Sequence, residues 1–202
     1  MRRSEFLVED QEAIKAFLET CEYGVLSLVS GDEPYGVAVN FAYDEGTFYF
    51  HGAREGRKAQ AIGETAPCSF TVVRPYAYIP SYFSNTHSAC PATQFFASVI
   101  ACGQVTRLDT MSQKIVGLNA LMTKMQPEGG YDPIDETNPI YTKMLSQTGV
   151  YMIESHTLTL KVKVGQNLPQ ERYETLIEHM KNRDSINDHE TFLAMQAHQP
   201  KG

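Results

Sequence analysis

Residues 46–62 combine a strand with a directly following helix, and this junction is the strongest constraint in the sequence. The first half, Gly46–His51, is aromatic and β-branched, as expected of a strand, and the second half is predicted to be a helix entered through two glycines. Backbone N–H groups, the positive end of the helix dipole and cationic side chains are then expected to converge on one small volume that suits a phosphate. The residues at the junction are His51, Arg54, Gly56, Arg57 and Lys58.

The same basic cluster has a simpler interpretation. Charged residues in the first turn of a helix are often solvated, and a short basic cluster is more often surface than binding site. Cations at a helix N-terminus are, however, locally unfavourable unless an anion compensates them. The dipole argument therefore favours an anion site, while the pattern alone leaves both interpretations open.

Length and charge bound the class of protein. The chain has 202 residues, of which 42% are hydrophobic and 20% charged, so we expect a globular protein of one domain with an appended element. A net charge of −7 argues against nucleic acid or an anionic membrane as the main partner. No apolar run approaches the ~20 residues of a membrane span, and the acidic start predicts a cytoplasmic protein. The four cysteines lack CxxC spacing and are predicted to be reduced, buried packing residues.

The first part of the chain is predicted to be an antiparallel meander that follows a helix capped by Asp10. One face of its second strand carries only small residues and one amide, which leaves room for a flat ligand close to the backbone or for close packing against another element. Asn40 on this face is a candidate donor or acceptor for a heteroaromatic edge. The expected strands are Tyr23–Ser30, Tyr35–Tyr43 and the strand that carries His51.

The middle of the chain alternates between loops, strands and one helix. After a strand at Cys68–Arg74, the aromatic segment Pro75–Ala92 is predicted to be an ordered loop over a pocket. His87 within this loop is given little weight as a ligand, because a lone loop histidine is more often a surface residue. Thr93–Arg107 is expected to be a long strand with a bulge or bend at Gly103. A capping box that starts at Asp109 or Thr110 then predicts a helix to about Met125, with an apolar stripe at Ile115, Leu118, Leu121, Met122 and Met125.

The last part is expected to be a short helix, two strands and a C-terminal extension. Asn167 is predicted to cap a helix that continues to about Lys181 and is followed by a polar tail. We therefore expect a domain over residues 1–165 and a helical extension over residues 166–202. The predicted helix is Pro139–Gln147, after a loop at Gln126–Asn138, and the predicted strands are Gly149–Ser155 and Leu158–Val164.

Six or seven short strands in hairpin order with flanking helices predict a mainly β protein, a small Greek-key barrel. The sequence resembles the FMN-binding split-barrel family, also called pyridoxamine 5′-phosphate oxidase-like, and in particular its nitroimidazole-resistance (Nim) branch. The resemblance covers about residues 1–165. It is carried by Pro34-Tyr35, Asn40-Phe41, Tyr43-Asp44, Gly46-Thr47-Phe48-Tyr49-Phe50-His51, Gly56-Arg57-Lys58, Ser98-Val99-Ile100 and Gly103.

This resemblance implies an FMN-dependent oxidoreductase of a small organic substrate, possible substrates including nitroimidazoles, that forms homodimers with flavin at the interface. Arg57 and Lys58 match positions that hold the FMN phosphate, while residues around Asn40 and His51 match positions along the isoalloxazine. His51 is also the one candidate for proton transfer. The cofactor-binding residues implied by the resemblance are Asn40, Phe41, His51, Gly52, Gly56, Arg57, Lys58 and Ser98.

Two further expectations limit the function. The chain has no tryptophan and no C-terminal Arg-x-His element, so pyridoxamine phosphate is not the expected substrate. The alternative is a non-catalytic binding protein on the same barrel that holds haem or F420. His87, His156 and His198 are the histidines available to haem iron, but their spacing does not support a site, and no metal site is predicted.

Overall fold

The computed structural model describes residues 3–84 and 87–199. It divides into two compact units, each built from separate parts of the chain. Unit 1 comprises Met1–Glu9, Val73–Ser98 and Leu160–Gly202, and unit 2 comprises Asp10–Val72 and Val99–Thr159. The expected division at residue 165 stays a prediction.

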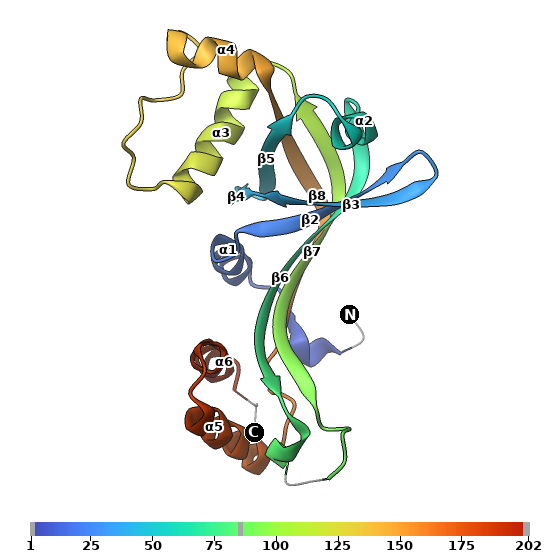
Figure 1. Ribbon diagram of the computed structural model, residues 1–202, viewed down its shortest axis with the longest axis vertical. Helices are drawn as coiled ribbons and strands as arrows, with labels where there is room; N and C mark the ends of the chain where they lie inside the picture. The colour runs from blue at the N-terminus through green and yellow to red at the C-terminus, as the bar shows by residue number, and fades with distance from the viewer. Residues whose placement is uncertain (1–2, 85–86, 200–202) are drawn as a thin grey trace. The chain divides into compact units, whose positions relative to one another are not determined.

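Eight strands form one sheet, whose order is β3-β2-β6-β7-β8-β5-β4, with β1 pairing with β8 (Figure 1). The strands are β1 (Leu7–Val8), β2 (Tyr23–Ser30), β3 (Glu33–Asn40), β4 (Ala42–Asp44), β5 (Thr47–Ala53), β6 (Thr65–Ile79), β7 (Thr93–Leu108) and β8 (Thr148–Lys163). The helices are α1 (Gln11–Glu19), α2 (Arg57–Ile62), α3 (Met111–Met125), α4 (Pro139–Gln147), α5 (Gln170–Arg183) and α6 (Ile186–Ala197), with short 3-10 helices η1 (Ser4–Phe6) and η2 (Ser81–Ser84). The expected mainly β fold with flanking helices is confirmed.

The predicted meander is wrong at its second strand. That strand divides at Phe41, which is 1% exposed, and the next residue, Ala42, is also buried and begins β4. Two consecutive buried residues break the alternation of a strand, so β3 pairs with β2 while β4 pairs with β5. The turn between β4 and β5 is as expected, because Glu45 and Gly46 both adopt positive φ, at 44° and 88°.

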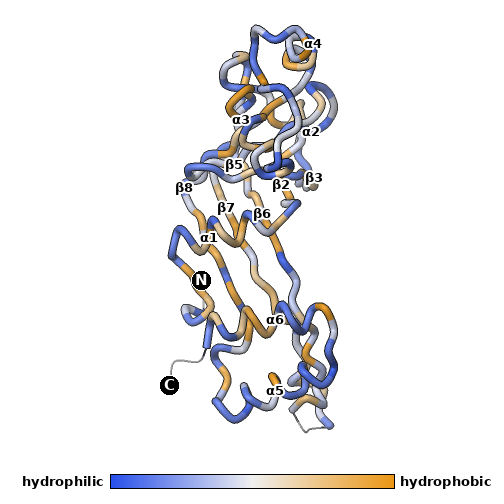
Figure 2. The backbone as a smooth tube through the Cα atoms, turned by 90° about the vertical axis from the view of Figure 1, so that its left-hand side faces the viewer, coloured by the Kyte–Doolittle hydropathy of each residue, from blue (hydrophilic) through white to orange (hydrophobic). Residues whose placement is uncertain are grey.

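The core of unit 2 is aromatic. The Phe41 ring lies 5.8 Å from the Phe48 ring and 5.2 Å from the Phe70 ring, and these rings meet at tilted or edge-on angles. Buried aromatic pairs in such geometries contribute ~0.5–1.5 kcal/mol beyond the burial of their area. Figure 2 shows the hydrophobic residues concentrated along the strands. The aromatic cluster therefore fixes the point at which the chain passes from β3 to β4.

Two of the long strands exceed their predictions. β6 continues to Ile79, so the first five residues of the expected loop Pro75–Ala92 are strand, and η2 follows; residues 85 and 86 of that loop lie outside the described residues. β8 is continuous from Thr148 to Lys163 where two strands were expected. Cross-strand pairing outweighs the local polarity of residues 155–157, which suggested a break. The predicted strand Thr93–Arg107 is confirmed as β7.

α3 begins as predicted, and its buried face overlaps the expected apolar stripe in part. The Thr110 hydroxyl and the Gln113 side chain form the expected capping box. The buried positions are Lys114, Gly117 and Leu121. In the expected apolar stripe, Ile115, Leu118 and Met122 are half-buried and Met125 is exposed. Lys114 can occupy a buried position because its ammonium donates to the Leu145 carbonyl oxygen at 2.7 Å. The expected stripe is therefore confirmed at Leu121 and wrong at Met125, and hydrophobicity alone did not predict the buried lysine.

The C-terminal segment contains two helices. Pro169 is the N-cap residue of α5 without a side-chain bond, so Asn167 does not cap the helix. The expected polar tail is instead α6, which starts with a capping box between Ser185 and Asp188. The carboxylate of Asp188 also pairs with Arg183, and this pairing allows a charged residue to be buried at the start of α6. The polar composition of this segment therefore suggested a tail, although the segment forms a helix whose polar groups hydrogen-bond to one another.

The four cysteines are reduced thiols, as expected. Cys21 is buried and Cys68 and Cys102 are half-buried, whereas Cys90 is exposed, which corrects the expectation that all four are buried. Burial raises the pKa of the Cys68 thiol to about 11, and Cys102 adds to the effect. Cys68 is therefore a protonated packing residue at neutral pH.

The backbones of β7 and β8 approach each other closely at Gly103. A Cβ atom at this position would lie 2.0 Å from the backbone oxygen of Glu154, and a backbone atom cannot move aside as a side chain does. The close approach explains the glycine that the sequence assigned to a bulge or bend.

We expect Gly103→Ala to lower the free energy of unfolding by about 1–3 kcal/mol in urea denaturation, because it overpacks the sheet. Gln104→Ala, at an exposed neighbour on β7, is the control and should change it by less than about 0.5 kcal/mol; equal stabilities of the two variants would contradict this.

Candidate functional site

The predicted junction lies in unit 2, where β5 ends at Ala53 and α2 begins at Arg57. Gly56 is the N-cap residue of α2 with φ at 97°, a conformation that side chains rarely adopt, and it provides no side-chain cap. The first turn of α2 holds no acidic residue. Its two cationic side chains, Arg57 and Lys58, take different directions.

Lys58 packs against a pair of stacked rings. Phe50 on β5 and Tyr151 on β8 stack with centroids 5.0 Å apart, and the Lys58 ammonium lies 5.3 Å and 5.5 Å from the two centroids. Burial lowers the pKa of Lys58. In residues 3–84 and 87–199 no carboxylate pairs with this half-buried ammonium, which therefore depends on the ring faces alone.

Gly52 makes space for the lysine. A Cβ atom at Gly52 would lie 2.4 Å from the Lys58 ammonium nitrogen. The Tyr151 hydroxyl donates to the Ala53 carbonyl oxygen at 3.2 Å, which holds the ring beneath the lysine. The sequence associated Gly52 with the cofactor, and the structure places it directly beside the cation proposed to hold the phosphate.

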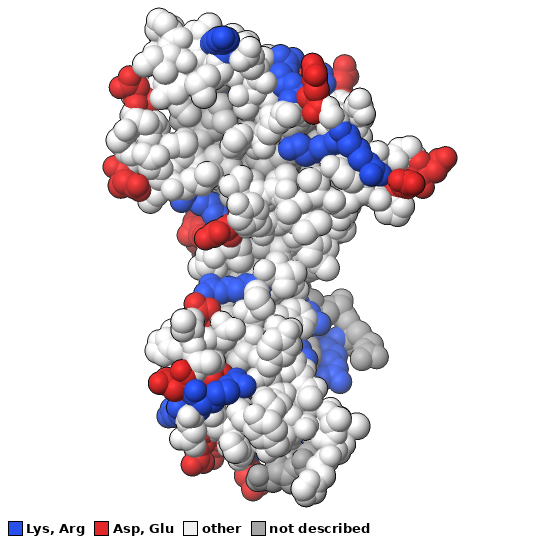
Figure 3. Space-filling view, in the orientation of Figure 1, with Lys and Arg blue, Asp and Glu red and all other residues white. Residues whose placement is uncertain are grey.

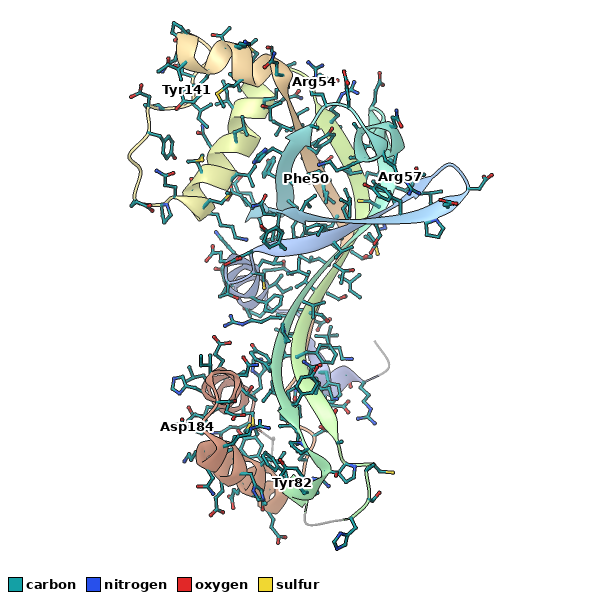
Figure 4. The ribbon with its side chains drawn as sticks, viewed as in Figure 1. Phe50, Arg54, Arg57, Tyr82, Tyr141 and Asp184 are labelled. Atoms are coloured by element: carbon teal, nitrogen blue, oxygen red, sulfur yellow. The ribbon has the colours of Figure 1, made fainter. Side chains whose placement is uncertain are left out.

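Arg57 points to the β2–β3 hairpin (Figure 4). Its guanidinium donates to the Ser30 hydroxyl at 3.2 Å and pairs with the Glu33 carboxylate at 3.1 Å, and it also lies over the Tyr35 ring. The side chains of Arg57 and Glu33 are 50% and 77% exposed, and such exposed pairs contribute only ~0–1 kcal/mol. Figure 3 shows basic and acidic side chains side by side near this hairpin. Arg57 can therefore exchange Glu33 for another anion at little cost.

Arg54 binds the end of another helix. Its guanidinium donates to the Ser146 carbonyl oxygen at 2.5 Å, next to the Leu145 carbonyl that Lys114 contacts. Two cations thus compensate the negative C-terminal end of α4. The pKa of Lys114 is lowered, first by its burial and then by Arg54. The sequence missed Lys114, and the available signal was its spacing with Gly117, Leu121 and Lys124 on one helical face.

The three cations of the predicted cluster therefore contact three different elements in this structure. Arg54 contacts α4, Arg57 contacts the β2–β3 hairpin, and Lys58 contacts the rings of β5 and β8. In this arrangement of side chains they do not converge, because each has a separate partner, and the phosphate site predicted from them stays a prediction. Of these three cations, only Lys58 lacks a hydrogen-bond acceptor or a carboxylate partner within the described part of the chain.

The remaining predicted site residues occupy different environments. His51 lies on the exposed side of β5, and Asn40 is half-exposed at the end of β3. The Phe41 side chain belongs to the aromatic core and is not accessible to a ligand. Ser98 is half-exposed on β7 and belongs to unit 1, whereas the other predicted residues belong to unit 2. Their role in cofactor binding stays a prediction.

One face of the sheet in unit 2 is apolar and exposed. On β2, Tyr23, Val25 and Val29 are 60%, 43% and 65% exposed and share one face with the exposed Ser27. Opposite them in register on β3 lie Asn40, Ala38 and Pro34, so the small-residue face predicted from the sequence is continuous with these side chains. An exposed, largely apolar patch on a sheet is typical of a contact with another protein.

A separate groove lies between α1, β4 and α3. It has a volume of about 700 Å³ and is lined by charged residues of both signs, among them Glu19, Asp44 and Lys124. Lys124 donates to the Leu18 and Cys21 carbonyl oxygens and lies 3.9 Å from the centroid of the Phe41 ring. This lysine caps the C-terminal end of α1, so its contacts are accounted for by the fold.

The fold has counterparts among solved structures. The flavocytochrome Anf3 from Azotobacter vinelandii is 21% identical with a TM-score of 0.66, and the alignment covers 84% of this chain and 75% of that one. The FAD and heme binding protein from Mycobacterium smegmatis is 16% identical with a TM-score of 0.66 and coverages of 78% and 73%. A protein from Bacteroides thetaiotaomicron VPI-5482, named for a proposed role in 5-nitroimidazole antibiotic resistance, is 19% identical with a TM-score of 0.61 and coverages of 77% and 86%. These similarities show a shared fold.

The family model of pyridoxamine 5′-phosphate oxidase matches residues 10–162. The chain therefore belongs to the pyridoxamine 5′-phosphate oxidase family, and the split-barrel resemblance drawn from the sequence is confirmed. A comparison with curated protein sequences gives no match.

Within the described residues, no helix has the length and apolarity needed to span a bilayer, and no cluster of three potential metal-binding side chains occurs.

His51 should make stability depend on pH. Burial lowers the pKa of His51 from its usual value of 6.5, and the charge of Lys58 adds to the effect. Because the folded pKa is the lower one, the unfolded chain takes up more protons as the pH falls below about 6.5, and acidification therefore destabilises the fold. We expect His51→Gln to lose stability less steeply than the parent from about pH 7 to about pH 5, as measured by urea denaturation. Parallel curves for variant and parent would contradict this.

Proposed function

We propose that this protein binds a flavin mononucleotide and acts as an oxidoreductase of a small organic substrate. The observation that carries the proposal is the Lys58 ammonium, half-buried over the Phe50 and Tyr151 rings with no carboxylate among the described residues to balance it. Family membership supports a flavin, and two of the structural neighbours are named for flavin or FAD binding. A flavin phosphate would provide the missing anion.

The phosphate would bind between Lys58 and Arg57. Arg57 follows Gly56, whose missing side chain leaves the backbone open to a ligand, and its contact with Glu33 is an exposed pair of little stability. A guanidinium and an ammonium that donate to the same phosphate form charge-assisted hydrogen bonds worth ~1.5–3 kcal/mol each. Release of Arg57 from Glu33 is then offset by the phosphate contacts.

The isoalloxazine would lie along β3 and β5. Asn40 offers an amide to the polar edge of the ring, and the small residues Gly36 and Ala38 leave the backbone accessible. His51 is exposed near Lys58 and has a lowered pKa, so it is neutral at pH 7 and able to accept a hydrogen bond. The flavin, once bound, supplies electron or hydride transfer, and these residues hold and orient it. The resemblance to the nitroimidazole-resistance branch makes a nitroaromatic compound the first substrate to test.

We expect Arg57→Ala with Lys58→Ala to weaken FMN binding by at least about 100-fold, because two charge-assisted contacts to the phosphate are removed. Absorption titration of the purified protein with FMN and with riboflavin measures this, and riboflavin, which lacks the phosphate, should bind both proteins equally weakly. Lys161→Ala, at a lysine of unit 1, is the control and should leave FMN binding unchanged.

Three results would contradict the phosphate assignment. They are unchanged FMN affinity in the double variant, equal affinity of the parent for riboflavin and FMN, and uptake of haem, seen as a sharp Soret band, without uptake of flavin. Unfolding curves of the double variant separate a lost contact from a lost fold.

We further propose that the exposed sheet face of β2 and β3 forms a homodimer interface. The alternation of Tyr23, Val25 and Val29 gives an apolar surface, and the facing β3 residues are small enough for close approach. A second copy of the same face would cover both, and a flavin that lies along β3 would then be enclosed by the partner chain.

Val25→Glu should convert the dimer to monomer, because it buries an unpaired charge in the interface. Sedimentation velocity over a range of protein concentrations checks this. Ile186→Glu is the control, since Ile186 on α6 is 85% exposed and belongs to unit 1. A parent protein that is monomeric throughout, or a Val25→Glu variant that remains dimeric, would contradict the proposed interface.

A further inference from the structure

Unit 1 contains a small cavity that the proposed flavin site does not use. It has a volume of about 160 Å³ and lies between η1, the first residues of β7, the end of β8 and α5. Its floor is apolar, since Phe6, Phe95 and Leu176 are at most 3% exposed. Gly165 closes one side with φ at 86°, and a Cβ atom there would lie 3.0 Å from the Phe95 ring. The cavity is thus a formed feature of the fold of unit 1.

The charged residues of the cavity are all basic, and its neutral polar lining residues are Thr93 and Asn167. Three cationic residues line it, Arg3, Lys163 and Arg172, and none of the lining residues is acidic. The described residues include four arginines with carboxylate partners, namely Arg57, Arg74, Arg107 and Arg183. None of the three cavity cations forms such a pair within the described part of the chain. In a chain with a net charge of −7, this grouping is not explained by composition.

Arg172 carries the clearest sign of a missing partner. Its Nη2 group donates to the Ser84 hydroxyl at 2.6 Å, whereas its Nε group is buried and has no acceptor among the described residues. A buried N–H group without an acceptor is costly and uncommon in folded proteins. The guanidinium is thus held at Nη2, while its Nε has no acceptor within residues 3–84 and 87–199.

Lys163 presents the second unbalanced charge. Its ammonium donates to the Thr93 hydroxyl and to the Gln94 carbonyl oxygen, which are neutral acceptors. Burial lowers the pKa of Lys163, and the charges of Lys161 and Arg3 add to the effect. Arg3 is directed toward Phe6, with 5.8 Å from its guanidinium carbon to the ring centroid. Three positive charges therefore share a partly dehydrated volume, where an anion would interact strongly.

We propose that this cavity binds a compact organic carboxylate whose apolar body lies on the phenylalanine and leucine floor. The carboxylate would accept from the Nε group of Arg172 and from Lys163, so it would satisfy the buried donor and balance the charge. The volume equals that of about five water molecules, which admits a single ring or a short chain and excludes a nucleotide. The apolar floor favours a carboxylate over inorganic phosphate, which has no apolar part to bury.

The test compares benzoate with benzamide by isothermal titration calorimetry on the full chain. The two compounds have nearly the same shape and differ in charge, so we expect benzoate to bind at least about 10-fold more tightly. Arg172→Met and Lys163→Met should each weaken benzoate binding by about 10-fold or more, because each removes one charge-assisted hydrogen bond. Lys181→Met is the control, at an exposed lysine of α5 outside the cavity lining, and should bind benzoate as the parent does.

Four outcomes would overturn the proposal. They are equal binding of benzoate and benzamide, phosphate binding without benzoate binding, no detectable benzoate binding, and an equal loss in Lys181→Met and Lys163→Met. If Arg172→Met does not fold, Arg172→Lys keeps the positive charge but removes Nε, and it should still weaken benzoate binding. FMN affinity is measured on the same samples, and it should not change in any of these variants, so failure here is distinguishable from failure of the flavin proposal.

Discussion

The pairing of β5 with β8 is the constraint on which the candidate site depends. Seven residues of β5 pair in antiparallel register with β8, from Thr47 opposite Glu154 to Ala53 opposite Thr148. This register places Phe50 opposite Tyr151, and their rings stack with an interplanar angle of 14°. A shift by one residue would move one ring to the other face of the sheet and leave Lys58 without its platform. The position of the cation is thus determined by a strand that lies about a hundred residues later in the chain.

The distribution of basic side chains follows from what each can reach. Arg54 and Lys114 compensate the carbonyl end of α4, and Arg107 is paired with Asp109. Asp109 has its pKa lowered, first by the hydrogen bond from Arg107. These cations are structural, because their hydrogen bonds satisfy helix ends and carboxylates. Lys58 differs because its contacts are aromatic rings, and an ammonium on ring faces retains its capacity to donate to an anion.

Local signals in the sequence predicted the local features of the fold, while pairing and burial decided the others. The caps at Asp10 and Thr110 and the turn at Glu45 depend on a few neighbouring residues and were predictable. The division at Phe41 depends on Phe48 and Phe70, which the chain reaches only later, and α6 depends on the Arg183–Asp188 pair. For the site, residue types and spacing predicted Arg57 and Lys58 as phosphate-binding candidates. The different directions of their side chains could not be predicted, because they depend on where the fold places Glu33 and Tyr151. Lys114 was missed because a lysine in a buried position contradicts hydrophobic periodicity.

The two units use positive charge in the same way, although they share no residues. In unit 2 a lysine is half-buried over aromatic rings, and in unit 1 an arginine and a lysine border an apolar floor. In both, burial lowers the pKa of a lysine, so the fold maintains a charged group where water would solvate it better. A protein of net negative charge gains no solubility from such placements, and their cost is reduced only when an anion enters. The unbalanced cations therefore mark where ligand binding would add most to the stability of each unit.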